Sequence, residues 1–366
     1  MIVAGGGTGG HLFPGLAVAE AMIAQGDVGV TDARVTDANV LFVGSAYGIE
    51  ATAVPRTPFA FQPLAIRGVR GRGVRGVLEF VWQLPLALLQ SWRVIGRFQP
   101  ALVLGLGGYS SVPMILAAWL RRVPSVLMEQ NAHPGMANRT LAYLARRVCT
   151  SFADSARFFP AGKAVQTGNP VRQLSIAKNH ASDHFTIFVF GGSQGARAIN
   201  RAVVDAATVL RARLPRMQLI HQTGPADLEW VQRCYAEGGV DAEVRPFVHD
   251  MGDAYGRADL VICRAGASTL AELTALGKPS ILIPYPYAAD DHQRANAEIL
   301  VRGGAAEMIL DAQVTGAVLA ERVLALAADR ARLRAMGAAA SALAVPDAAQ
   351  RVVAVCRQVV EEEGVR

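Results

Sequence analysis

The chain has 366 residues, a 52% apolar composition and a formal net charge of +6. Its length suffices for two ordinary domains with cores of their own, and its four cysteines are too scattered to form a metal clip or a redox motif. The charge favours an anionic partner, but nucleic acid is not expected because no aromatic and basic platform or recognition helix stands out. The cysteines fit a reducing cytoplasm, and the first residues indicate a core strand rather than a signal peptide.

Predicted strands and helical segments alternate along the chain, which indicates an α/β fold. In the first half, strands are expected near residues 1–4, 40–43, 102–106, 125–128 and 147–150. In the second half, they are expected near residues 186–190, 218–222, 242–246, 260–263 and 280–284. This pattern is typical of doubly wound parallel sheets, which bind ligands at the carboxyl ends of their strands.

Residues 101–120 carry no charge and are long enough to span a membrane. The glycines at residues 107–108 and Pro113 argue against a continuous spanning helix. We expect a buried strand over residues 102–106, then a polar loop, then a helix that ends near residues 121–122.

A turn-rich passage over residues 167–172 predicts a hinge between two domains. The domains are expected to cover residues 1–168 and 169–346. A last helix within residues 347–366 would either close the second domain or pack back on the first.

Both predicted domains begin with a strand, a glycine-rich loop and a helix. Residues 5–11 read GGGTGGH before helical periodicity over residues 16–24, and residues 191–197 read GGSQGAR before a helix over residues 198–210. Glycines let backbone N–H groups approach a ligand closely, and a helix N-terminus favours phosphate. The sequence therefore predicts that a phosphate-bearing ligand binds between the halves.

The first loop also matches the G-x-G-x-x-G spacing of dinucleotide-binding enzymes, at Gly5, Gly7 and Gly10. An NAD-dependent oxidoreductase is thus one alternative. Such enzymes bind the ribose with an acidic residue at the end of the second strand, whereas that strand is expected here to end in Gly-Ser-Ala at residues 44–46. The carboxylate is missing from this place, and one dinucleotide site would not explain the second glycine loop.

His11 follows the first loop at the start of the predicted helix. The N-terminus of a helix disfavours a charged imidazole, so His11 would stay neutral near pH 7, as a general base requires. An isolated histidine more often packs or caps a helix. The Thr-Gly-Gly context favours the catalytic interpretation.

Six short motifs follow one another along the chain. They are GGGTGGH at residues 5–11, GGYSS at 107–111, EQNA at 129–132, GNPVR at 168–172, GGSQGAR at 191–197 and RAGASTLAE at 264–272. In this order they resemble the MurG family of peptidoglycan N-acetylglucosaminyltransferases. The resemblance implies a GT-B fold, in which two Rossmann-like, doubly wound domains face a central cleft.

The resemblance also implies an inverting glycosyltransferase of peptidoglycan synthesis. It would move N-acetylglucosamine from UDP-N-acetylglucosamine to the 4-hydroxyl of undecaprenyl-pyrophosphoryl-MurNAc-pentapeptide (lipid I), giving lipid II. His11 would be the base, and Tyr109, Ser110 and their neighbour Ser111 would lie on the acceptor side. Val112 replaces a glycine of the usual family pattern, which puts the local backbone shape in doubt.

Donor-binding residues are implied in both halves. They are Thr8, Gly9, Gly10, Asn131, Arg172, Ser193, Val248, Ala267, Ser268, Thr269, Leu270, Ala271, Glu272 and Gln293. The backbone of Val248 would meet the uracil, Glu272 the ribose hydroxyls and Gln293 the sugar. These assignments suit UDP-N-acetylglucosamine. Its diphosphate needs N–H, hydroxyl or arginine donors, and the hydroxyls of its ribose and sugar need carboxylate or amide groups.

Structural alternatives exist for several of these residues. Thr269 and Glu272 have the spacing of a helix capping box. Asn131 and Ser193 would suit turns, and Arg172 would suit a solvated hinge.

Stabilisation of the departing UDP is expected from the amides of the second glycine loop and the helix behind it. An Asp-x-Asp pair, which holds a divalent ion in many sugar-nucleotide enzymes, is absent; the nearest groupings are Asp290-Asp291 and Asp241-x-Glu243. We therefore expect no metal site and no required cofactor. A non-essential divalent cation held by the donor phosphates is left open.

Arginines 67, 70, 72 and 75 interleave with glycines before an apolar, aromatic segment over residues 77–84. This composition is expected of a surface that rests on anionic lipid. The resemblance accordingly implies a peripheral enzyme on the cytoplasmic face of the inner membrane, with other cell-wall synthesis proteins as further partners. The alternatives are a solvated loop before a core helix, or arginines that meet the pyrophosphate of lipid I.

Two further interpretations compete with this one. Another GT-B enzyme, such as a lipid glycosyltransferase or a UDP-N-acetylglucosamine 2-epimerase, would share the donor half, but GGYSS and EQNA in the other half favour the MurG family. A non-catalytic membrane scaffold is opposed by the retention of His11, Arg172 and the donor loops.

Overall fold

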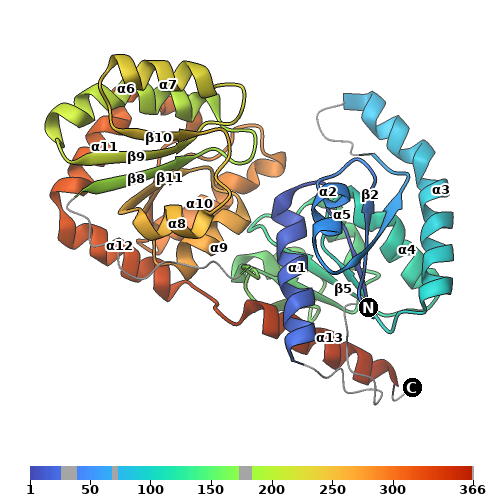
Figure 1. Ribbon diagram of the computed structural model, residues 1–366. Helices are drawn as coiled ribbons and strands as arrows, with labels where there is room; N and C mark the ends of the chain where they lie inside the picture. The colour runs from blue at the N-terminus through green and yellow to red at the C-terminus, as the bar shows by residue number, and fades with distance from the viewer. Residues whose placement is uncertain (26–38, 68–72, 173–183, 365–366) are drawn as a thin grey trace. The chain divides into compact units, whose positions relative to one another are not determined.

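The computed structural model describes residues 1–25, 39–67, 73–172 and 184–364. The chain forms two compact units (Figure 1). The first comprises Met1–Arg172 and Val345–Arg366, and the second comprises Gln173–Ala344. The border therefore follows Arg172, and the C-terminal helix belongs to the first unit.

The first unit is built on a seven-stranded parallel sheet with the order β3-β2-β1-β4-β5-β6-β7. Its strands are β1 (Ile2–Ala4), β2 (Leu41–Ser45), β3 (Ala60–Leu64), β4 (Val103–Gly105), β5 (Ser125–Glu129), β6 (Arg147–Thr150) and β7 (Ala164–Gln166). Its helices are α1 (Gly9–Ala24), α2 (Glu50–Ala53), α3 (Gly73–Phe98), α4 (Val112–Leu120), α5 (Met136–Leu141) and α13 (Ala348–Gly364).

Helices cover both faces of this sheet because alternate strand residues point to opposite sides. On one face, Val3 belongs to a core that includes Leu12 of α1 and Val352 of α13. On the other, Ile2 belongs to a core that includes Met114 of α4. The final helix, whose placement the sequence left open, thus packs on the first unit against α1.

The second unit has a six-stranded parallel sheet with the order β10-β9-β8-β11-β12-β13. Its strands are β8 (Phe185–Phe190), β9 (Met217–Gln222), β10 (Ala242–Arg245), β11 (Leu260–Cys263), β12 (Ser280–Leu282) and β13 (Ala306–Met308). Its helices are α6 (Arg197–Arg213), α7 (Leu228–Glu237), α8 (Met251–Arg257), α9 (Ala267–Ala275), α10 (His292–Arg302), α11 (Gly316–Ala328) and α12 (Arg330–Ala342).

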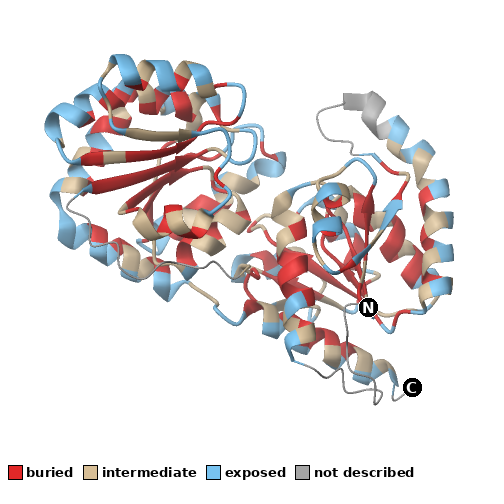
Figure 2. Ribbon diagram, in the orientation of Figure 1, coloured by how far each residue is buried: buried red, intermediate tan, exposed pale blue. Residues whose placement is uncertain are grey.

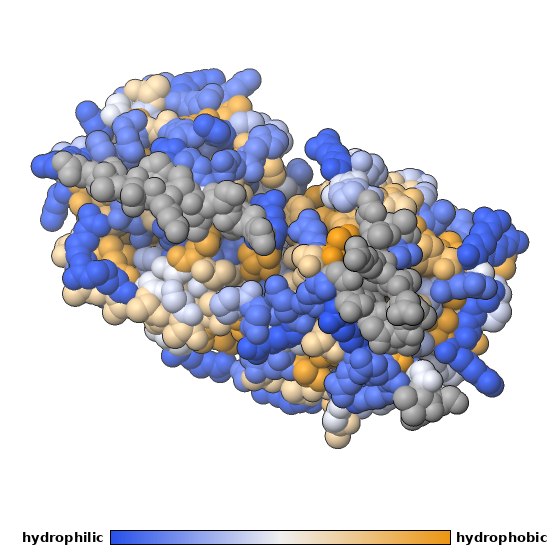
Figure 3. Space-filling model, turned by 60° about the horizontal axis from the view of Figure 1, so that its bottom comes forward, coloured by the Kyte–Doolittle hydropathy of each residue, from blue (hydrophilic) through white to orange (hydrophobic). Residues whose placement is uncertain are grey.

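The central strands of both sheets are buried, as Figure 2 shows in red. Every residue of β8 is buried, and its side chains alternate between two environments. Ile187 and Val189 join the core with α6 and α11, whereas Phe188 meets the ring of Tyr255 from α8 edge-on at 5.4 Å. Hydrophilic side chains cover most of the face in Figure 3, with apolar groups between them.

The predicted parallel α/β fold is confirmed, and all ten expected strands form. Residues 101–120 contain β4 and α4 with a loop between them, as predicted, and no helix of the described residues is long and apolar enough to cross a membrane. Three strands were not predicted: β3, β7 and β13. Two have three residues each, and β3 (AFQPL) is half-exposed and contains a proline, so none shows a clear buried run.

The arginine- and glycine-rich stretch does not end as a loop before the apolar segment at residues 77–84, because α3 already begins at Gly73. Arg70 and Arg72 lie outside the described residues.

Candidate active site

The site residues of the first unit lie at the carboxyl edge of its sheet. The first glycine loop follows β1, Tyr109 follows β4, and Asn131 follows β5. These three strands are neighbours in the order β1-β4-β5 and are parallel, so the segments that follow them emerge at one edge.

Glu50 organises the first glycine loop. The residue is 1% exposed, and its carboxylate accepts hydrogen bonds from the backbone N–H groups of Gly7 at 2.7 Å and Ser45 at 2.9 Å. A Cβ atom on Gly6 would lie 2.3 Å from the carboxyl carbon, so only glycine fits there. The amide of Gly7 is thus already bonded to an anion of the protein, which makes this loop less suited to a diphosphate than the sequence suggested.

Glu50 was not among the predicted site residues. The second strand was expected to end at residues 44–46, where there is no carboxylate, whereas Glu50 follows five residues after Ser45. This carboxylate lies against the glycine loop and bonds to the protein, so it is not the ribose ligand of a dinucleotide site. Gly44 and Gly48, which precede it, leave room for its side chain, because a Cβ on either would collide with Glu50, but nothing in the local sequence marks this role.

Tyr109 packs beside the same loop. A Cβ on Gly7 would lie 3.2 Å from its ring. Burial raises the pKa of the Tyr109 hydroxyl; a hydrogen bond with Ser45 lowers it, and the charge of Glu50 raises it further. Tyr109 therefore stays a neutral phenol near pH 7.

The serines after Tyr109 are less accessible than predicted for an acceptor site. Ser110 and Ser111 are completely buried, and the Ser111 hydroxyl donates to the Gly108 carbonyl at 2.9 Å. Of these three residues, only Tyr109 is partly exposed. Val112 has ordinary helical angles (φ −55°, ψ −55°), so the backbone does not require the family's glycine there.

His11 lies in the first turn of α1, which begins after Thr8. The Thr8 hydroxyl makes no helix-capping bond; its Oγ1 lies 2.9 Å from Nδ1 of His11. In the tautomer in which Nδ1–H donates to Thr8, the Nε2 atom is the acceptor that a general base needs. Gly9 and Gly10 are the first two residues of this helix.

Asn131 is held by a buried carboxylate. Glu129 accepts from the Asn131 backbone N–H at 2.9 Å and its Nδ2 at 3.2 Å, and from Asn138 Nδ2 at 2.9 Å. Burial raises the pKa of Glu129, and these hydrogen bonds act against that rise. The side chain of Asn131 is thus fixed, which a simple turn residue would not require. Arg172, at the end of this unit, stacks its guanidinium 5.1 Å from the ring centroid of Phe13.

The second glycine loop joins β8 to α6. Gly195 has φ +75°, and a Cβ on it would lie 1.9 Å from the Thr223 carbonyl oxygen, so the loop lies directly on the segment after β9. Ser193 at its tip is exposed. Gly192 and Gly195 contact an amide group and a carbonyl group, in contrast to the carboxylate under the first loop.

Gln222 links this loop to Val248. Its Nε2 donates to the Gly192 carbonyl at 2.9 Å, and its Oε1 accepts from the Val248 backbone N–H at 2.8 Å. Val248 is buried, and a uracil contact through its N–H would displace Gln222. Sequence reasoning missed Gln222.

The capping-box interpretation of Thr269 and Glu272 is wrong. Helix α9 begins at Ala267 after Gly266, and no side chain caps it. Glu272 instead accepts a hydrogen bond from the Tyr255 hydroxyl at 2.9 Å.

The residues implied at Ala267–Glu272 are of two kinds. Ala267 and Leu270 are buried, so they offer a ligand only backbone groups, whereas Ser268, Thr269, Ala271 and Glu272 are partly exposed. Asn296, which sequence reasoning missed, donates to the Ala265 carbonyl at 3.2 Å in the loop before the helix.

Gln293 lies in the first turn of α10, where its Oε1 accepts from the Tyr285 backbone N–H at 2.9 Å. Its amide NH₂ group thereby has a fixed orientation. Before it, Asp290 and Asp291 are exposed and have positive φ angles of 52° and 50°. Among the described residues, no group of three or more His, Cys, Asp or Glu side chains is placed to hold a metal ion.

Known proteins match both units of the chain. The glycosyltransferase family 28 N-terminal domain matches residues 1–150, and the C-terminal domain of that family matches residues 186–352. The UDP-N-acetylglucosamine--N-acetylmuramyl-(pentapeptide) pyrophosphoryl-undecaprenol N-acetylglucosamine transferase of Myxococcus xanthus is 43% identical over 360 residues, 97% of this chain and 92% of that protein. The protein of the same name from Geobacter sulfurreducens is 44% identical over 96% of both chains.

The crystal structure of Acinetobacter baumannii MurG matches with a TM-score of 0.78 and 31% identity, covering 98% of each chain. The chain belongs to the MurG family. As a MurG-family protein it is a glycosyltransferase with a GT-B fold of two Rossmann-like domains.

The epimerase alternative rests on fold alone. The UDP-GlcNAc 2-epimerase of Neisseria meningitidis matches this MurG-family chain with a TM-score of 0.66 at 11% identity, covering 96% of this chain and 98% of that one. At this identity only the architecture is shared. The transferase interpretation is favoured over the epimerase interpretation.

Proposed function

We propose that the chain transfers N-acetylglucosamine from UDP-N-acetylglucosamine to the 4-hydroxyl of lipid I, giving lipid II with inversion at the anomeric carbon. The observation that carries the proposal is identity of 43% over 97% of the chain to a transferase whose name states this donor and acceptor. The proposal extends that activity to this protein.

In the proposed reaction His11 accepts the proton of the attacking hydroxyl at Nε2. Thr8 supports this role, because its hydroxyl at 2.9 Å from Nδ1 orients the ring and accepts from Nδ1–H in the tautomer that leaves Nε2 as the acceptor. Tyr109, a neutral phenol beside the same loop, offers a hydrogen-bond donor on the acceptor side. The internal carboxylate of Glu50 favours an uncharged part of the substrate next to this loop.

The diphosphate of the donor is proposed to bind the second glycine loop, with Ser193 at its tip and the N-terminus of α6 behind it. The carboxylate of Glu272 would accept from ribose hydroxyls, and Gln293 would bond the sugar through its oriented amide. Backbone amides and the helix dipole would stabilise the leaving UDP, so no metal or other cofactor is required in this proposal.

The proposed membrane contact is the outer face of α3. Leu78, Trp82, Leu86 and Leu89 recur at intervals of three or four residues and are all exposed, with Trp82 at 87%. Near its end, the Arg121 guanidinium lies 4.0 Å from the centroid of the Trp92 ring. Apolar and aromatic side chains beside arginine suit the interface of an anionic membrane, so we propose peripheral binding at the cytoplasmic face of the inner membrane.

The test is product analysis. The protein is incubated with UDP-N-acetylglucosamine and a lipid I analogue in detergent, with and without EDTA; the lipid fraction is analysed by mass spectrometry and the sugar nucleotides by NMR spectroscopy. The proposal predicts an acceptor heavier by one N-acetylhexosamine in both conditions. Conversion of the donor to an epimer without acceptor would contradict it in favour of the epimerase, and product lost with EDTA would contradict the metal-independent site.

A further inference from the structure

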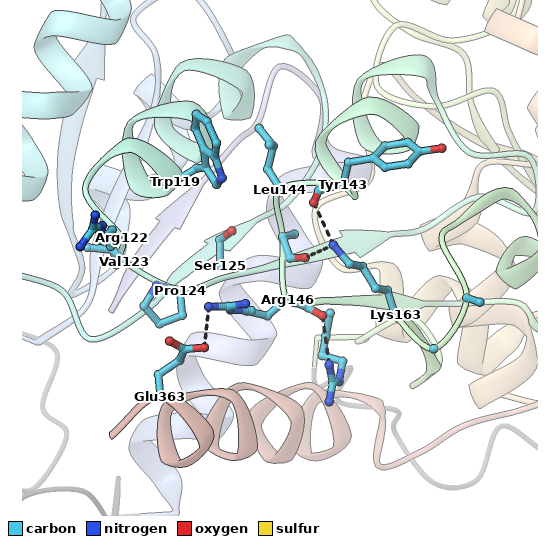
Figure 4. Close-up of a pocket in the computed structure, with 14 residues that line it drawn as sticks. Trp119, Arg122, Val123, Pro124, Ser125, Tyr143, Leu144, Arg146, Lys163 and Glu363 are labelled. Carbon is cyan, nitrogen blue, oxygen red and sulfur yellow. Dashed lines mark hydrogen bonds and ion pairs between the residues drawn. The ribbon is translucent and has the colours of Figure 1, made fainter. Parts of the chain in front are cut away.

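A cavity of about 550 Å³ opens at the amino edge of the first sheet (Figure 4). Ser125 and Arg147, the first residues of β5 and β6, line it. The glycine loop, Tyr109 and Asn131 follow the opposite ends of parallel strands. The cavity is therefore separate from the candidate active site, and the proposed reaction does not use it.

The lining of this cavity is strongly basic. Four basic residues and one acidic residue line it: Arg122, Arg146, Arg147, Lys163 and Glu363. Figure 4 shows Arg146 directed toward Glu363, and their Nη2 and Oε1 atoms are 2.7 Å apart. Glu362 pairs with Arg147 at 3.3 Å. The end of α13 thus places an anion at the mouth of a basic cavity.

Lys163 is fixed rather than mobile. Its Nζ donates to the carbonyls of Ala142, Tyr143 and Ala145 at 2.8 to 2.9 Å. Burial lowers the pKa of its ammonium group, and the charges of Arg146 and Arg147 lower it further. The two arginines and the lysine therefore share a region of positive potential that the glutamates compensate only in part.

We propose that this cavity binds a phosphate group, in the place that the Glu363 carboxylate takes in this structure. Arginine guanidinium groups bind carboxylate and phosphate with the same planar pairs of N–H donors, so Arg146 has the chemistry to exchange one for the other. Trp119 and Tyr143 at the rim are 53% and 74% exposed and offer apolar surface to the organic part of a phosphate ester.

If phosphate competes with Glu363 for Arg146, one substitution should weaken phosphate binding and another should strengthen it. Binding of inorganic phosphate and of glycerol phosphate is measured by titration calorimetry at low ionic strength. The proposal predicts binding at least about fivefold weaker in Arg146→Gln and about two- to fivefold tighter in Glu363→Gln, the range that exposed ion pairs span. Matched controls are Arg201→Gln on α6 and Glu361→Gln on α13, which lie outside the cavity lining and should leave binding unchanged.

The source of the phosphate is distinguished with vesicles. Phosphatidylcholine vesicles with and without phosphatidylglycerol are compared for the same four variants. Variant-dependent binding of phosphatidylglycerol vesicles but not of free phosphate identifies a lipid head group, and variant-dependent binding of free phosphate identifies the phosphate group itself.

Two results would overturn the proposal. One is equal weakening by Arg146→Gln and Arg201→Gln, which would mean that overall charge alone binds the anion. The other is a Glu363→Gln variant that unfolds at lower temperature but binds phosphate and vesicles as the wild type does. In that case the ion pairs only dock α13 on the sheet.

Discussion

The Oγ1 atom of Thr8 lies 2.9 Å from Nδ1 of His11, although Thr8 occupies the position where a hydroxyl usually caps a helix. If this contact orients the base, Thr8→Val should lower kcat about tenfold with a smaller change in donor KM, and Thr8→Ser should retain most activity. The pH profile of kcat should also shift in Thr8→Val. Equal loss in Thr8→Ser, or an effect on KM alone, would argue for a donor contact instead.

The Glu50 carboxylate bonds two backbone N–H groups, at Gly7 and Ser45. In Glu50→Gln one of these amides would face an NH₂ group, and a buried donor without an acceptor costs about 1–3 kcal/mol. We expect a lower free energy of unfolding and a lower kcat, measured by denaturant unfolding and turnover. The control is Glu20→Gln, at an exposed position of α1. Equal stability of the two variants would exclude the structural role of Glu50.

Gly192 and Gly195 provide a matched pair in the second glycine loop. Both have positive φ, but a Cβ on Gly195 would collide with the Thr223 carbonyl, whereas a Cβ on Gly192 meets nothing within 4 Å. Gly192→Ala should cost only the backbone strain of about 1 kcal/mol. Gly195→Ala should displace the loop and weaken UDP binding by tenfold or more, on the order of 1.4 kcal/mol, in a calorimetric titration. Similar UDP affinity in both variants would show that the loop does not bind the diphosphate.

His221 in the second unit makes stability depend on pH. Its ring is fully buried between the Tyr235 hydroxyl at 2.7 Å and Asn200 Oδ1 at 3.1 Å, and burial lowers its pKa to about 3. Because the folded pKa lies below the unfolded value, the contribution of the neutral ring is complete above pH 6.5. It is lost as the pH falls toward 3, by about 1.4 kcal/mol per pH unit.

Denaturant unfolding between pH 7 and 5 measures this slope. The change of unfolding free energy with pH should be smaller in His221→Gln. It should be unchanged in His249→Gln, because His249 is exposed. A slope that is the same in all three proteins would mean that His221 does not bind its proton on unfolding.

Trp82 on α3 tests the membrane surface. Trp82→Gln should reduce binding to vesicles that contain phosphatidylglycerol several-fold, because a large exposed aromatic side chain would no longer enter the interface. Sedimentation with vesicles measures the effect. Tyr287→Gln, at a residue 79% exposed in the second unit, is the matched control. Equal binding by both variants would place the membrane contact elsewhere.

How far the sequence predicts this structure depends on the range of the interactions involved. Strand β8 is a continuous apolar run that is buried throughout, and such runs are visible in the sequence. The role of Glu50 is not visible in the sequence. Its hydrogen bond with the Gly7 amide joins residues 43 positions apart, and no local spacing marks it. Gln222 and Val248, which are 26 positions apart, were missed as a pair for the same reason.

A local pattern gives a wrong prediction where the same residue spacing occurs in two different structures. Thr269 and Glu272 satisfy the capping-box rule, but α9 starts two residues before Thr269 and turns Glu272 toward Tyr255. At the start of α1, by contrast, the helix is present where the sequence shows no helical pattern. Its apolar period begins near residue 16, whereas the helix begins at Gly9, since glycine and Pro14 carry no periodic signal.

The most direct test of the central claim is the release of UDP from UDP-N-acetylglucosamine, measured with and without a lipid I analogue, in wild type and His11→Ala. The account predicts release that depends on the acceptor and falls about 10²- to 10⁴-fold in the variant, as expected for loss of a general base. Release that is indifferent to the acceptor, or undiminished in His11→Ala, would contradict it.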